Sequence, residues 1–252
     1  MPSVIGLNSV RIDMTRITAI LATILSLAFT PVAAQDFSKG LAAYQAGDYA
    51  TTLQEWIPSA EAGDAVAQYN LGIMYYNGKG VPQDYAEAVK WYRLSAEQGD
   101  AGAQYNLGVM YDNGEGVLQD YAEAVKWYRL SAEQGDADAQ LNLGFMYEKG
   151  KGVLQDYAEA VKWFRLAAEK GTAEHGTEQA QAILGLMYQD GMGVLQDNVK
   201  AHMWTNIASA NGLKEAGGMR DKLAAKMTAS DISKAQAMAR ECMASDYKKC
   251  GY

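Results

Sequence analysis

The chain has 252 residues, with 30 Asp and Glu against 22 Lys and Arg and a formal net charge of −8. This acidic balance argues against electrostatic binding to nucleic acid or anionic membranes, because both require clustered Lys and Arg. Only two cysteines and four prolines are present, which excludes a disulfide-rich scaffold, a set of zinc modules and a Pro-rich disordered linker. The composition is that of a well-packed acidic protein.

Residues 1–34 have the pattern of a signal peptide. Two arginines precede an apolar run over residues 17–29, and small residues follow it. The pattern predicts cleavage before Gln35 and a periplasmic or secreted protein, with translation starting at Met1 or Met14. An uncleaved anchor is disfavoured because the run is shorter than the ~20 apolar residues that span a bilayer. We therefore expect no stable membrane insertion after cleavage.

A 36-residue unit recurs through most of the chain. Residues 67–102 and 103–138 differ at only five of 36 positions. Further copies start at Ala139 and, after a five-residue insertion, at Ala180, and an abbreviated copy over residues 49–64 precedes them all. A fixed period of this size indicates stacked supersecondary units, each of which buries its apolar face on its neighbours.

Each copy contains two helical periodicities, which predict a helix hairpin. In the copy at 67–102 the first apolar stripe is Ala67, Leu71, Met74 and Tyr75, and the second is Ala88, Trp91, Tyr92 and Ser95. One tryptophan recurs in every second helix, which indicates core packing: Trp56, Trp91, Trp127, Trp163 and Trp204.

Turn and capping residues mark the ends of these helices. The segment 77–80, Asn-Gly-Lys-Gly, can adopt positive φ, so the first helix is expected to end there. Asp84 is placed to cap the second helix, and Glu87 three residues later completes a capping-box pattern. The same pair recurs as Asp120 with Glu123 and as Asp156 with Glu159.

A glycine lies in the middle of each first helix, where it costs ~1 kcal/mol relative to Ala. Its recurrence predicts that two helices approach too closely there for any side chain. The four positions are Gly72, Gly108, Gly144 and Gly185.

The pattern A-x-x-x-LG-x-MY-x-x-G-x-GV-x-QDY-A-E-A-V-K-W closely resembles the Sel-one-like (SLR) repeat, a relative of the tetratricopeptide repeat. The resemblance covers residues 37–212 and departs at both ends. The first copy lacks the long GxGVxQ loop, and Asn-Val-Lys-Ala at 198–201 replaces Tyr-Ala-Glu-Ala in the last copy. The resemblance implies an all-α fold, an α/α superhelical solenoid of tetratricopeptide-like hairpins used as an adaptor surface, with no inherited active site.

The predicted organisation has four parts. These are a signal peptide at 1–34, a tetratricopeptide-like hairpin at 35–64, four Sel-one-like repeats at 65–212 (65–100, 101–136, 137–172 and 178–212) and a C-terminal helical cap at 213–252. In the last part, Thr228 and Asp231 can cap a final helix, and a solenoid needs terminal units that cover its apolar end.

The two cysteines, Cys242 and Cys250, are expected to form a disulfide, as paired thiols in exported proteins usually do. This bond would fold the tail back on the capping helix. A redox-active or partner-linked pair is the alternative, but the CxxC spacing is absent.

No motif for catalysis or cofactor binding is present. His175 and His202 have no His or Cys at ligand spacing, so neither a metal site nor a cofactor is predicted. A GxSxG elbow, a P-loop and a dinucleotide fingerprint are also missing from the sequence. Some cysteine-rich relatives of the resembled repeat act on β-lactams, but they carry a cysteine pair in each repeat, whereas residues 35–241 contain none. We therefore predict a protein that is not an enzyme.

The leading hypothesis is an exported adaptor that binds a protein or peptide in its concave groove, and the alternative is a cell-envelope protein that restrains a peptidoglycan-processing enzyme. In tetratricopeptide-like superhelices the first helix of each pair lines the concave wall. The predicted wall residues are Tyr69, Ile73, Tyr76 and Asn77, then Tyr105, Val109, Asp112 and Asn113, then Leu141, Phe145, Glu148 and Lys149, then Ala182, Leu186, Gln189 and Asp190.

Apolar anchors with an acidic edge suit a segment that carries apolar side chains and some positive charge. Tyr69 and Tyr105 are expected to lie outside the buried stripe. Residues 85–100 and 121–136 are identical, whereas the first helices and loops differ. The wall is either tuned for a ligand or the product of neutral drift after duplication, and the sequence leaves both open.

Overall fold

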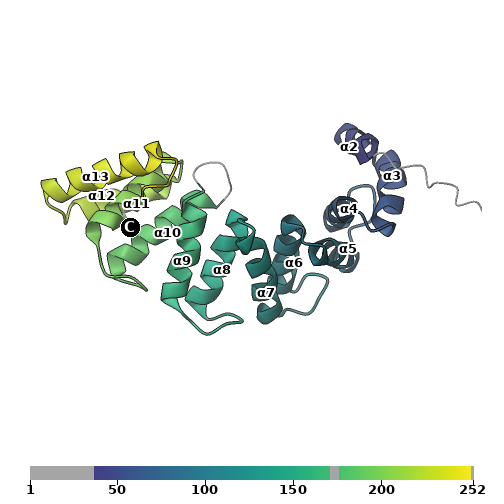
Figure 1. The fold of residues 1–252 in the computed structure, drawn as a ribbon, viewed down its shortest axis with the longest axis horizontal. Coiled ribbons are helices and arrows are strands. Elements are labelled where there is room, and N and C mark those ends of the chain that lie inside the picture. The colour runs from purple at the N-terminus through teal and green to yellow at the C-terminus, as the bar shows by residue number, and fades with distance from the viewer. Residues whose placement is uncertain (1–36, 171–175, 251–252) are drawn as a thin grey trace, which may run out of the picture. The chain divides into compact units, whose positions relative to one another are not determined.

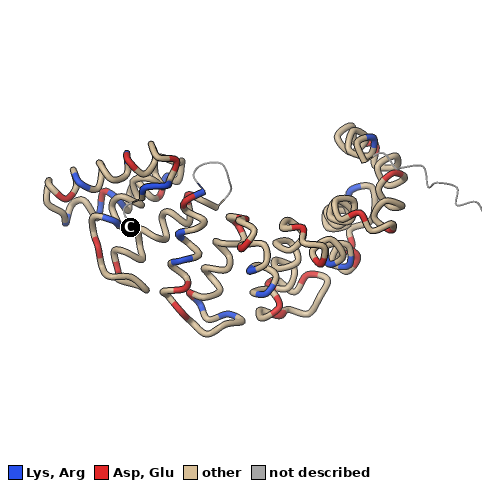
Figure 2. The backbone as a smooth tube through the Cα atoms, viewed as in Figure 1, with Lys and Arg blue, Asp and Glu red and all other residues tan. Residues whose placement is uncertain are grey.

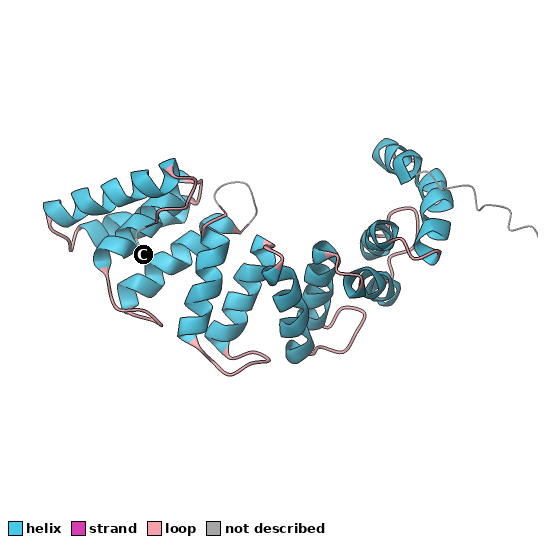
Figure 3. Cartoon of the chain, in the orientation of Figure 1, coloured by secondary structure: helices cyan, strands magenta, loops and turns pink. Residues whose placement is uncertain are grey.

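The computed structural model describes residues 37–170 and 176–250, and all regular secondary structure in these ranges is helical (Figures 1 and 3). The predicted signal peptide, the predicted cleavage site at Gln35 and His175 lie outside the described residues. Among the described helices, none has the length and hydropathy needed to cross a bilayer.

The described helices follow one another as hairpins. Their bounds are α2 (Phe37–Ala46), α3 (Tyr49–Glu61), α4 (Ala65–Asn77), α5 (Tyr85–Glu97), α6 (Ala101–Asn113), α7 (Tyr121–Glu133), α8 (Ala137–Lys149), α9 (Tyr157–Ala168), α10 (Thr177–Asp190), α11 (Asn198–Ala210), α12 (Lys214–Ala224) and α13 (Ala229–Ala244). Within a hairpin the two helices pack on each other, and each second helix also packs on the next first helix, as α5 does on α6. This arrangement confirms the all-α solenoid of helix hairpins.

The mid-helix glycines mark the closest contacts inside the hairpins. A Cβ atom on Gly72 would lie 2.5 Å from a ring carbon of Tyr92, and one on Gly108 would lie 2.6 Å from a ring carbon of Tyr128. These distances are too short for any real Cβ, and the rings are buried. The prediction of a close approach is therefore confirmed.

The predicted caps form, with one difference. An Asp84 side-chain oxygen accepts a hydrogen bond from the Glu87 backbone N–H at 3.0 Å, and Gly78 ends α4 with a φ of 65°. The reciprocal half of the capping box is replaced, because the Asp84 backbone N–H donates to the Tyr75 carbonyl at 3.0 Å. The Glu87 carboxylate instead pairs with Lys90 at 2.8 Å. Asp84 thus fixes the loop to α4 as well as capping α5.

The last repeat keeps its cap although its sequence departs from the pattern. Asp197 accepts hydrogen bonds from the backbone N–H groups of Val199 and Lys200, both at 3.0 Å. These bonds need only backbone donors, so the replacement at 198–201 does not affect them. The replacement affects a side-chain ion pair instead. Lys200 occupies the position of Glu87, whose carboxylate pairs with Lys90 in α5.

The buried residues agree with the two predicted stripes. All five tryptophans are buried, and Trp56 and Trp204 are fully enclosed. Ser95 is also fully buried, and its hydroxyl donates to the Ala65 carbonyl at 2.8 Å, which ties α5 to the start of α4. Tyr75 is the exception, because it is half-buried at the edge of the hairpin.

The C-terminal helices cover the end of the solenoid as predicted. Both α12 and α13 pack on α11, and the Thr228 hydroxyl accepts a hydrogen bond from the Asp231 N–H at 3.1 Å to cap α13. The disulfide between Cys242 and Cys250 is present. It holds Tyr247 in a buried position, from which its hydroxyl donates to Asn211 at 3.1 Å at the end of α11.

Candidate functional site

The row of predicted site residues on α4, α6, α8 and α10, here called the first-helix wall, is mostly half-buried. These side chains lie between the hairpin core and the surface, because they contact both their own second helix and the next hairpin. The half-buried members are Tyr69, Ile73, Tyr76, Tyr105, Val109, Asp112, Leu141, Phe145, Glu148 and Gln189. Asn77, Asn113, Lys149, Leu186 and Asp190 are exposed, and Ala182 is buried. The wall therefore differs at α10, where the alanine is buried and the leucine is exposed.

Tyr69 and Tyr105 are more closely packed than the sequence suggests. The Tyr69 ring lies 6.0 Å from the Tyr92 ring, and a Cβ atom on Gly102 of the next hairpin would lie 3.1 Å from its hydroxyl end. Tyr105 packs in the same way on Tyr128. Both remain half-buried, so they lie outside the buried stripe as expected. Helical periodicity describes contacts within one hairpin, however, and it did not predict that the next hairpin also packs on these rings.

The wall tyrosines lie in a negative electrostatic environment. Burial, followed by Asp138 and Asp136, raises the pKa of Tyr105 to about 12. Burial also raises the pKa of Tyr76, and Glu115 adds to this effect because it accepts a hydrogen bond from the Tyr76 hydroxyl at 3.1 Å. Burial is the main cause of both pKa shifts, and the nearby carboxylates add to it because they oppose loss of a phenol proton.

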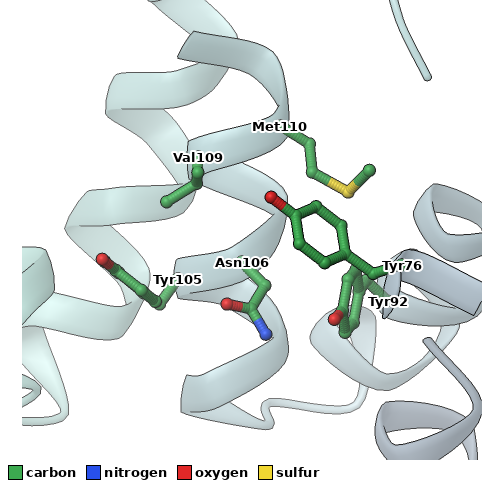
Figure 4. A pocket seen from close by; sticks show the side chains of 6 residues that line it. All are labelled: Tyr76, Tyr92, Tyr105, Asn106, Val109 and Met110. Atoms are coloured by element: carbon green, nitrogen blue, oxygen red, sulfur yellow. The ribbon is translucent and has the colours of Figure 1, made fainter. Parts of the chain in front are cut away.

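A cavity of about 140 Å³ opens between α4, α5 and α6 (Figure 4). In Figure 4, Tyr76 reaches from the preceding hairpin toward α6, with Tyr92 beside it. The lining residues are Tyr76, Tyr92, Tyr105, Asn106, Val109 and Met110. Three of them are predicted wall residues. Tyr92 was predicted as a core residue, and Asn106 and Met110 were not predicted at this site.

The equivalent place in the next repeat has different chemistry. Asp112 stands where Tyr76 stands, Leu141 replaces Tyr105 and Phe145 replaces Val109. The Phe145 ring packs edge-on against Phe164 with their centroids 5.2 Å apart. The first-helix wall therefore presents different side chains from one repeat to the next on an unchanged backbone pattern.

The described titratable groups outside the wall do not gather into a metal-binding cluster. Among residues 37–170 and 176–250, no group of three or more His, Cys, Asp and Glu side chains could hold a metal ion. His202 is buried in α11, and burial lowers its pKa, which keeps the imidazole neutral at physiological pH. Acidic and basic residues are spread along the chain rather than gathered in one block (Figure 2). The first-helix wall is thus the strongest candidate site.

The model of the Sel1 repeat matches four segments, at residues 65–100, 101–136, 137–172 and 178–213. The chain belongs to the Sel1 repeat family. The predicted resemblance is therefore confirmed. A Sel1 repeat scaffold is typical of proteins that bind other proteins. No curated protein matches the chain at a significant level.

Two solved structures of Sel1 repeat proteins are similar to this chain. One is a Sel1 repeat protein from Oxalobacter formigenes, with 36% identity, 74% coverage of each chain and a TM-score of 0.66. The other is c5321, a protective antigen of uropathogenic Escherichia coli strains with an SLR fold, with 30% identity and a TM-score of 0.71. The second match covers 96% of this chain but 50% of c5321, so this chain spans half the length of that protein.

The hydrogen bond between Tyr76 and Glu115 is another feature of the site that the sequence analysis did not predict. The two residues are 39 positions apart, so no pattern within a single Sel1 repeat connects them. A signal existed, because both lie among the five positions at which residues 67–102 and 103–138 differ. Two neighbouring repeats must be read together to find such a pair.

Proposed function

We propose that this Sel1 repeat protein is an exported, non-catalytic adaptor that binds a segment of another protein along the first-helix wall. The observation that carries the proposal is the row of half-buried aromatic and aliphatic side chains with carboxylates beside them on successive first helices. Partly buried aromatic anchors near charged groups are typical of the energetically important part of protein interfaces.

The distribution of differences between the two most similar repeats supports this role for the wall. Residues 85–100 and 121–136 are identical and supply the core of each hairpin. Four of the five differences touch the wall or its border: Ile73/Val109, Tyr76/Asp112, Lys79/Glu115 and Gly102/Asp138. If these differences arose by neutral drift, substitutions at these positions would leave partner binding unchanged. A binding experiment can exclude that outcome.

Site-specific photocrosslinking in intact cells tests the proposal. A photoreactive amino acid at Val109 on the wall is expected to trap a partner protein. The matched control places it at Lys126 on α7, whose side chain is 58% exposed and lies outside the wall. Equal trapping at both positions, or none at Val109, would contradict the proposal. A peptidoglycan-processing enzyme among the trapped proteins would identify the chain as a regulator of the cell envelope.

Export is a separate part of the proposal and rests on the signal-peptide pattern of residues 1–34. Cell fractionation followed by N-terminal sequencing is expected to find a chain that begins at or near Gln35. A membrane-bound product that still carries residues 14–34 would contradict export by cleavage, without bearing on the wall.

A further inference from the structure

The cavity between α4, α5 and α6 has two chemically different sides. Val109 and Met110 on α6 form an apolar side, while Tyr76 and Tyr92 bring aromatic rings and hydroxyl groups from the preceding hairpin (Figure 4). Its volume of about 140 Å³ is well below the roughly 300–1,000 Å³ of pockets that hold whole small-molecule ligands. The cavity is therefore of a size for one side chain of a larger partner.

A carboxylate stands at the edge of this cavity where neighbouring repeats have a lysine. Glu115 occupies the position of Lys79 in the preceding repeat and Lys151 in the following one. Each lysine lies over a tyrosine ring of the hairpin before it, with Lys79 Nζ 5.1 Å from the Tyr44 centroid and Lys151 Nζ 4.7 Å from that of Tyr121. In two neighbouring repeats an exposed cation from this loop therefore lies against an aromatic ring of the preceding hairpin.

At the junction of α4 and α6, a carboxylate occupies the position that a lysine has in the neighbouring repeats. Glu115 is half-buried, and one of its oxygens accepts the hydrogen bond from Tyr76. The Tyr76 ring packs on Tyr85 with centroids 5.2 Å apart, and Asp136 and Asp138 contribute negative charge next to Tyr105. Aromatic faces and carboxylates together attract a cation. At this junction the repeat has a carboxylate at the position where the two neighbouring repeats have a lysine.

We infer that this cavity receives an Arg or Lys side chain of the bound segment, an inference that rests on the proposed function. The aliphatic stem would pack on Val109 and Met110, as the stems of long basic side chains do on apolar surfaces. The charged head would then reach the Tyr76 ring and the Glu115 carboxylate, which can accept a charge-assisted hydrogen bond.

A pair of small probes tests this assignment on the isotope-labelled full chain by NMR. N-butylguanidinium reproduces an arginine side chain, and N-butylurea has nearly the same planar shape without the charge. We expect N-butylguanidinium to cause saturable amide shifts at Asn106, Val109 and Glu115, with an affinity about tenfold higher than that of N-butylurea, as a hydrogen bond to a charged group implies.

Substitutions at Glu115 connect this preference to the carboxylate. Glu115→Lys places the residue of both neighbouring repeats at this position and is expected to abolish the preference. Glu115→Gln keeps the shape, removes the charge and should reduce the preference in the same direction. Glu133→Lys, at the exposed end of α7, makes the same change in net charge and should leave the preference unaltered. Backbone amide spectra of each variant check that the fold is retained.

The probe and the crosslinking experiment can fail separately. Equal binding of both probes, or no saturable shift in the unmodified chain, would overturn the cation assignment even if Val109 traps a partner. A selective response to N-butylguanidinium without any trapped partner would support the pocket chemistry and count against the adaptor role. A preference that persists in Glu115→Lys would also overturn the assignment, because the carboxylate would then play no part.

Discussion

Two successive junctions of the solenoid, α4–α5–α6 and α6–α7–α8, have the same packing and different walls. Ser95 donates to the Ala65 carbonyl at 2.8 Å in the first, and Ser131 donates to the Ala101 carbonyl at 2.9 Å in the second. Gln98 with Gln68 and Gln134 with Gln104 form equivalent side-chain hydrogen bonds, both at 2.7 Å. The identical second helices therefore reproduce one framework.

On the wall the same two junctions diverge. The first has Tyr76 hydrogen-bonded to Glu115, and the second has Asp112 beside Tyr128, with Phe145 packed on its own hairpin. Packing and surface chemistry are thus carried by separate positions of the repeat. A few substitutions in the first helix and loop can change the chemistry of the wall while the hairpin stays intact, since they do not touch the hydrogen bonds that hold it.

The largest expected effect comes from the mid-helix glycines. Gly72→Ala and Gly108→Ala should each lower the free energy of unfolding by about 1–3 kcal/mol, because a Cβ at either position meets a buried tyrosine ring. The two values should be nearly equal in denaturant titrations. Gly218→Ala in α12 is the control, since nothing lies within 4 Å of its added Cβ, and it should stabilise the protein by up to ~1 kcal/mol. Unequal losses at Gly72 and Gly108 would show that the junctions are not equivalent.

Removing the half-buried wall tyrosines should have the next largest effect. Tyr69→Ala and Tyr105→Ala are each expected to cost about 1–2 kcal/mol of unfolding free energy, roughly half the loss for a fully buried aromatic residue. Tyr69→Phe keeps the ring and should cost much less. Thermal and denaturant unfolding measure these losses. A negligible loss in Tyr69→Ala would mean that the contact with Gly102 does not stabilise the junction.

Loss of the buried serine hydroxyls should have a smaller, matched effect. Ser95→Ala and Ser131→Ala each remove the hydrogen bond that a buried hydroxyl donates to a backbone carbonyl, and each should cost about 1 kcal/mol. Equilibrium unfolding of the single and double variants checks this prediction, and the two losses should add. A large difference between them would break the equivalence of the two frameworks.

The smallest expected effect on stability is that of Tyr76→Phe. The change removes the hydrogen bond to Glu115 at a half-exposed position, so the free energy of unfolding should change by less than ~0.5 kcal/mol. The aromatic ring stays in place, so trapping of a partner from Val109 should persist. Loss of trapping without loss of stability would assign the contact to the hydroxyl instead of the ring.

Local rules predicted the framework from the sequence. The repeating glycine and the Asp84-type caps each depend on contacts within one hairpin, so a single 36-residue unit contains the information. The tryptophan was predicted from its recurrence, although it also packs on the second helix of the preceding hairpin. The disulfide between Cys242 and Cys250 was predicted from the presence of two cysteines in a chain expected to be exported. The capping box was only half right, because the Asp84 backbone N–H is used by the loop that folds back on Tyr75.

The site was predicted less completely, since its contacts cross from one repeat to the next. The packing of Tyr69 depends on Gly102, and the position of Glu115 depends on Tyr76 in the preceding hairpin. A helical wheel drawn for one helix shows neither contact. Of the sixteen predicted wall residues only Tyr76, Tyr105 and Val109 line the cavity, and the cavity itself could be located only from the structure.

The near identity of two adjacent units has a consequence for how this protein can change in length. An in-frame deletion of residues 101–136 would join α5 to α8 through Asp100, which caps α6 as Asp136 caps α8. Because α5 and α7 have identical sequences, α5 would pack on α8 as α7 does now, so only contacts along the first-helix wall would be new. Tyr76 would then face Lys151 instead of Glu115. A single recombination event between the two coding segments would remove one hairpin and reverse the charge beside Tyr76 at the same time.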